Sequence, residues 1–127
     1  MPKQRINPTT LSKPTGYSHV VKVGNIVYLA GQVALKPDGT IAGPGDPRAQ
    51  TEQVYRNIQA ALTSVGATLK DLVKTTTFVT SPDYISAIRE VRVRYLPDEP
   101  PASTLVVVSR LAQPEFLVEI EGIAHLD

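Results

Sequence analysis

Two glutamates near the C-terminal end are the residues of this sequence best suited to acid–base chemistry. Glu119 and Glu121 alternate with Val118 and Ile120 in an apolar run over residues 116–124. Alternate side chains of a strand point to opposite faces, so the two carboxylates share one face. We interpret Glu121 as a solvent-facing or ion-paired residue. Glu119 lies deeper in the run and is either another such residue or a carboxylate that deprotonates or orients a water, with a pKa raised by burial.

Two further segments offer polar groups or a close approach of the backbone. Tyr17, Ser18 and His19 supply a phenol, a hydroxyl and an imidazole just before a predicted strand. Polar residues at this spacing are typical of a turn at the protein surface, and they do not identify a Ser-His-acid triad. Ala30 and Gly31 end another predicted strand with small residues. This pair indicates either a close approach of backbone to ligand or a bulge or tight subunit contact.

The composition excludes several classes of function. The chain has 127 residues, a formal net charge of +1, no cysteine and two histidines far apart. We therefore expect one domain over residues 1–127, with no disulfide, no thiol catalysis, no metal and no cofactor. Without a basic excess we expect no nucleic-acid partner. No apolar run approaches the roughly 20 residues of a membrane span, and no apolar stretch follows the basic N-terminus. We expect a cytoplasmic protein with no membrane partner.

Turn signals and periodicity predict the elements that position these residues. Residues 1–16, rich in proline, are interpreted as an extended, partly mobile lead-in. Asp46 as N-cap, Pro47 at the first position and Gly66 after the end delimit a first helix. Ser81 and Pro82 open a second helix, over about residues 83–95, whose arginines we interpret as a solvated face with Glu90 as a partner. Strands are expected over residues 19–23, 25–32, 72–80, 103–109 and 116–124.

The predicted order is β-β-α-β-α-β-β, an α+β domain with two helices on one face of a mixed sheet. The strands over residues 25–32 and 103–109 are apolar on both faces. Two helices cover only one sheet face, so the other face would leave a large apolar patch on a monomer. We therefore expect this face to be buried against other subunits.

Several segments together resemble the RidA/YjgF family of reactive intermediate deaminases, which an older name describes as L-PSP endoribonucleases. The resemblance covers about residues 16–124 and is carried by Gly-Tyr-Ser at 16–18, Ala-Gly-Gln at 30–32, Ala-Gln-Thr at 49–51, Asp-Leu-Val-Lys-Thr-Thr at 71–76 and Val-Glu-Ile-Glu-Gly-Ile-Ala at 118–124. It implies a chorismate-mutase-like fold, a homotrimer, and a ligand cleft at each subunit interface.

The resemblance also implies chemistry and site residues. Family deaminases hydrolyse enamines and imines such as 2-aminoacrylate to a 2-oxo acid and ammonia. Glu119 matches the glutamate that orients the water, and Tyr17 and Gly31 match residues that line the pocket. Three matching positions differ from the family pattern. Ala30 lies where the family has a serine, Ile88 where it has an asparagine, and Ser103 where it has the arginine that binds the substrate carboxylate.

Two functional hypotheses follow. In the first, the chain is a divergent enamine or imine deaminase in which Glu119 positions water while Ser103, Thr104 and Tyr17 hold a small metabolite. Arg110, just past the same strand, is not expected to replace the missing arginine. In the second, it is a non-catalytic trimer that binds a small ligand or a partner. Ribonuclease activity is the least favoured alternative, because the sequence offers neither a basic surface nor a histidine acid–base pair.

Overall fold

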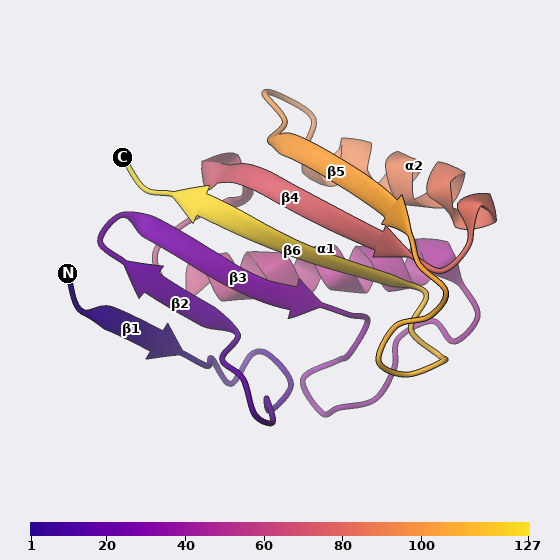
Figure 1. Cartoon of the computed structure of the whole chain (residues 1–127), viewed down its shortest axis with the longest axis horizontal. Coiled ribbons are helices and arrows are strands. Elements are labelled where there is room, and N and C mark those ends of the chain that lie inside the picture. The colour runs from indigo at the N-terminus through magenta and orange to yellow at the C-terminus, as the bar shows by residue number, and fades with distance from the viewer.

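The computed structural model describes residues 1–127 as one mixed sheet with two helices on one face (Figure 1). The sheet order is β1-β2-β3-β6-β4-β5, and only β4 and β5 run parallel. The strands are β1 Lys3–Ile6, β2 Val20–Val23, β3 Ile26–Gln32, β4 Leu72–Val79, β5 Ala102–Val107 and β6 Val118–His125. The helices are α1 Pro47–Thr63 and α2 Ile85–Tyr95, with short 3₁₀ turns η1 Leu69–Asp71 and η2 Pro82–Tyr84. The predicted α+β class, with both helices on one face, is confirmed.

The N-terminal segment contains a strand that the sequence did not predict. β1 pairs antiparallel with β2, from Lys3 opposite Val23 to Ile6 opposite Val20. Its side chains are exposed apart from the half-buried Ile6, so the segment shows no apolar alternation. An edge strand that pairs mainly through backbone hydrogen bonds shows no alternation of apolar and polar residues, so the sequence does not predict it.

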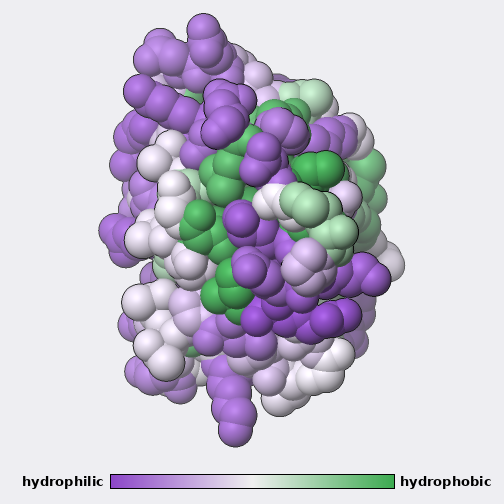
Figure 2. Space-filling view, turned by 90° about the vertical axis from the view of Figure 1, so that its left-hand side faces the viewer, coloured by the Kyte–Doolittle hydropathy of each residue, from purple (hydrophilic) through white to green (hydrophobic).

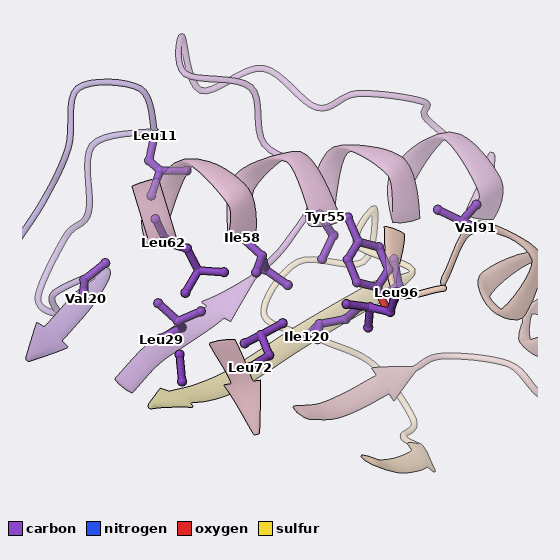
Figure 3. Packing of buried hydrophobic residues seen from close by; sticks show 14 of the residues in the cluster. Leu11, Val20, Leu29, Tyr55, Ile58, Leu62, Leu72, Val91, Leu96 and Ile120 are labelled. Carbon is purple, nitrogen blue, oxygen red and sulfur yellow. The ribbon is translucent and has the colours of Figure 1, made fainter. Parts of the chain in front are cut away.

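The first helix follows its predicted boundaries closely. The Asp46 carboxylate accepts hydrogen bonds from the backbone N–H groups of Arg48 (3.0 Å) and Ala49 (3.1 Å), as an N-cap does. Gly66 adopts the left-handed conformation, with φ +74°. Figure 3 shows side chains of α1 packed onto the sheet, among them Ile58 and Leu62. Neither helix has the length and hydrophobicity that a membrane crossing requires.

The second helix is tied to the first by ion pairs. Arg94 pairs with Glu52 and Arg48 pairs with Glu90. Glu90 thus binds an arginine of α1, not one of its own helix as the sequence suggested, because α1 and α2 pack side by side. The helix itself begins at Ile85, after the 3₁₀ turn that Ser81 caps by accepting from Asp83 N at 3.1 Å.

The sheet face opposite the helices exposes large apolar side chains. Tyr28 is 46% exposed, Val106 37% and Ile26 36%. In the single chain β5 lies at the sheet edge and only Leu105 packs against the core, so the expected burial of residues 103–109 on both faces stays a prediction that requires other subunits. Figure 2 shows the neighbouring side of the molecule, where both termini lie, and hydrophobic groups are open among hydrophilic ones there as well.

Candidate functional site

Glu119 lies half-buried on the sheet face that the helices leave open. Along β6 the side chains of Val118 and Ile120 are fully buried, while those of Glu119 and Glu121 point to the other face. Glu121 is exposed, whereas Glu119 is partly enclosed. The alternation predicted from the sequence therefore holds, and only Glu119 is removed from bulk water.

A β-bulge at Ala30 and Gly31 makes room for the Glu119 carboxylate. The pairing of β3 with β6 runs from Leu29 opposite Gly122 to Gln32 opposite Ile120, so β3 contains one extra residue. A Cβ atom at Gly31 would lie 2.0 Å from Oε2 of Glu119 and 2.8 Å from its Cδ. Of the two alternatives for this pair the bulge is present, and the backbone of Gly31 lies directly under the carboxylate.

A buried polar network braces the bulge. His19 is 2% exposed, and its Nε2 donates to the carbonyl of Ser12 at 2.7 Å. The side-chain amide of Gln32 donates to His19 Nδ1 at 3.1 Å and to the carbonyl of Ala30 at 3.2 Å. The sequence did not reveal this positioning role, because the network joins segments that meet only when β2 and β3 pair.

Tyr17 completes the group around Glu119. Its ring packs edge-on against His19, with the ring centroids 5.4 Å apart. Burial, and then the Glu119 carboxylate, raise the pKa of the Tyr17 phenol. The pKa of Glu119 is raised as well, first by burial and then by the charge of Glu121. Tyr17, Gly31 and Glu119 thus come together within one chain, around a carboxyl that holds its proton to higher pH than usual.

Ser103 and Thr104 do not share a pocket. Thr104 accepts a hydrogen bond from Lys74 Nζ at 2.8 Å on the open sheet face. Ser103, its neighbour in the strand, points to the helix side, where its Oγ lies 3.4 Å from the Thr75 hydroxyl. The hypothesis that both hydroxyls hold one ligand therefore fails within a single chain.

Ser103 is also remote from Glu119 of the same chain. Thr75 pairs with both Ser103 and Gly122, whereas Glu119 pairs with Phe78, three residues further along β4. Three residues of a strand span about 10 Å, and the two side chains point to opposite faces. A small ligand cannot contact both groups of one chain.

Ile88 and Arg110 are engaged elsewhere. Ile88 is 1% exposed and belongs to the hydrophobic core, so its assignment as a ligand contact is corrected. It lies with Val91 on the apolar stripe of α2, which faces inward. The guanidinium of Arg110 donates to the carbonyls of Leu111 and Ala112, both at 3.1 Å. These contacts hold the guanidinium against its own loop, and the expectation that Arg110 does not replace an arginine at position 103 stays a prediction.

Known proteins match nearly the whole chain. A family model described as Endoribonuclease L-PSP matches residues 9–126. A RutC family protein of Pyrococcus abyssi is 37% identical and covers 98% of each chain. The 3-aminoacrylate deaminase RutC of Acinetobacter baylyi is 35% identical, over 99% of this chain and 100% of its own. The crystal structure of RidA from Psychrobacter superimposes with a TM-score of 0.91 at 35% identity, covering 97% of this chain and 99% of that one. The chain belongs to the RidA/YjgF family, which is also described as endoribonuclease L-PSP.

Proposed function

We propose that this protein hydrolyses the enamine or imine of a small carboxylic acid, with Glu119 placing the attacking water. The observation that carries the proposal is the half-buried Glu119 carboxylate, which is seated over the Gly31 backbone and whose charge acts on the pKa of the Tyr17 phenol. Its raised pKa makes the carboxylate a stronger base than an ordinary glutamate, which suits a group that accepts a proton from water and returns it. The name of the A. baylyi relative, a 3-aminoacrylate deaminase, supports this class of reaction.

The proposed reaction needs only water and proton transfers. The enamine takes a proton on carbon and becomes an imine. Water then adds to the imine carbon as Glu119 accepts one of its protons. That proton passes to nitrogen, and as the C–N bond breaks the hydroxyl of the adduct releases its proton to solvent, which balances the proton first taken up on carbon. The products are an oxo acid and ammonia. Water supplies the oxygen of the new carbonyl, so no oxidant or reductant is required.

The proposed site lies between subunits of a homotrimer. Within one chain the Glu119 group stands on the open sheet face and is bounded on one side only. That face also exposes Tyr28 and Val106, whose burial against a second copy would remove apolar surface from water. A second subunit would thus cover the face and close the cleft over a small ligand.

The test is a coupled assay of ammonia release from 3-aminoacrylate and 2-aminoacrylate, each generated in situ, with and without the purified protein. We expect a saturable acceleration over the uncatalysed rate for at least one of them. The absence of acceleration for both, together with thermal stabilisation by a small carboxylate, would support the non-catalytic binding function instead.

The neighbouring carboxylate provides a second prediction. Because the Glu121 charge helps to raise the pKa of Glu119, Glu121→Gln should lower that pKa. A base works when it is deprotonated, so the acid limb of the kcat/KM profile should move to lower pH. The plateau rate should change little. An acid limb that stays in place, or moves to higher pH, would contradict this electrostatic link.

A further inference from the structure

We propose that Arg92 of α2 is the carboxylate-binding cation of this protein and acts with the hydroxyls of Ser103 and Thr75. The inference rests on the proposed function for the identity of the substrate. The binding site itself is argued from the groove beside β5.

Arg92 lines a groove of about 350 Å³ between the end of α2 and the edge of the sheet. Pro100 and Pro101 form part of its wall, and Thr75 and Ser103 contribute their hydroxyl groups. Ser103 is small, so the groove stays open where a longer side chain at this position would project into it. No aspartate or glutamate lines the groove, so a bound anion would meet no opposing charge.

The polar groups of this groove lack strong partners in the protein. Arg92 is half-buried and takes part in none of the ion pairs of the structure. Burial raises the pKa of the Tyr55 phenol to about 12, and the positive charge of Arg92 acts in the opposite direction, so the guanidinium lies near that phenol. Thr75 is 3% exposed, and its hydroxyl has only the long 3.4 Å contact with Ser103. A guanidinium beside two such hydroxyls is a donor set that matches a carboxylate.

Other cations of the chain are less suited to this role. Ion pairs occupy three arginines, which are Arg48, Arg56 and Arg94. Lys74 lies at a hollow of about 190 Å³ that Glu121 also lines, so an anion there would be repelled. A hollow of about 710 Å³ between α1 and the loop after α2 holds Lys70 but also Asp98 and Glu99. Arg92 therefore has a charge that no ion pair neutralises, and it lines a groove that contains no aspartate or glutamate.

The position of Arg92 also determines which subunits would contribute residues to one active site. Its groove lies on the helix side of the sheet, next to Ser103, whereas Glu119 lies on the open face about 10 Å further along the strands. A three-carbon substrate cannot bridge these groups within one chain. Arg92 of one subunit would therefore hold the carboxylate while Glu119 of the next places the water.

Binding of propionate tests the anion site without requiring turnover. We expect Arg92→Gln to weaken propionate binding about 10- to 100-fold, measured by NMR titration, and to leave the weak binding of neutral propionamide unchanged. Arg89→Gln, an exposed arginine of the same helix, is the matched control and should bind as wild type. Ser103→Asp, which leaves α2 intact, should also abolish propionate binding. Undiminished affinity in Arg92→Gln, or no affinity in the wild type, would overturn the proposal even if the protein is a deaminase.

Mixed oligomers test the sharing of the site. Glu119→Gln and Arg92→Gln chains, each impaired alone, are co-expressed with different tags, and hybrids are purified and sized by light scattering. If the two residues act from different subunits, some interfaces of a hybrid retain both, and activity should return. If they act within one chain, no hybrid contains an intact site. Hybrids of wild-type size that remain inactive would refute the shared site.

Discussion

Replacement of Glu119 by glutamine is expected to lower kcat/KM for the enamine or imine substrate by about 100- to 10,000-fold, the usual contribution of a general base. Glutamine keeps the shape of the side chain and removes its ability to accept a proton. Glu119 is only half-buried, so the fold and the oligomer should survive the change. Ammonia release measures the rate. Thermal unfolding and light scattering show whether the variant keeps its fold and its oligomeric state.

Glu121→Gln is the matched control for this experiment. Both glutamates lie on β6 with side chains on the same face, but Glu121 is exposed and lines the Lys74 hollow, whereas the Glu119 side chain occupies the space over Gly31. We expect its rate at the pH optimum to stay within a few-fold of wild type. A Glu119→Gln protein as active as this control would exclude Glu119 as the base.

The parts of the fold that the sequence predicted are those with a local cause. Asp46, Pro47 and Gly66 delimit α1 because capping and left-handed turns are decided within a few residues. The alternation around Glu119 likewise follows from the two-residue period of a strand. The resemblance added the Tyr17, Gly31 and Glu119 group, which the fold brings together.

The parts that sequence reasoning missed depend on pairing between distant segments. β1 is visible only once β2 offers it a partner. Ser103 and Thr104 point to opposite faces by strand alternation alone, but only the pairing of β5 with β4 at the sheet edge puts Ser103 beside Thr75 and the groove. Arg92 looked like one of several solvated arginines until α2 was placed beside β5, where it borders the groove.

Substitution of Gly31 by alanine is expected to lower turnover about 100-fold while changing the melting temperature little. The new Cβ would lie 2.0 Å from Oε2, 2.8 Å from Cδ and 3.0 Å from Cγ of Glu119. These atoms belong to the flexible end of a side chain, so Glu119 can rotate away without disturbing the strands. A carboxylate displaced by about 1 Å or more no longer holds the water in line with the imine carbon, and misplacement of that size costs about 100-fold in rate.

A double-mutant cycle separates this indirect effect from a direct role of Gly31 in binding. If the alanine acts by displacing Glu119, it has nothing left to displace in a Glu119→Gln background. The Gly31→Ala/Glu119→Gln protein should then be no slower than Glu119→Gln alone, as coupled residues are non-additive. If instead the two losses multiply, Gly31 contributes independently of Glu119, for example through its backbone against the ligand. The bulge would then serve the substrate directly as well as the glutamate.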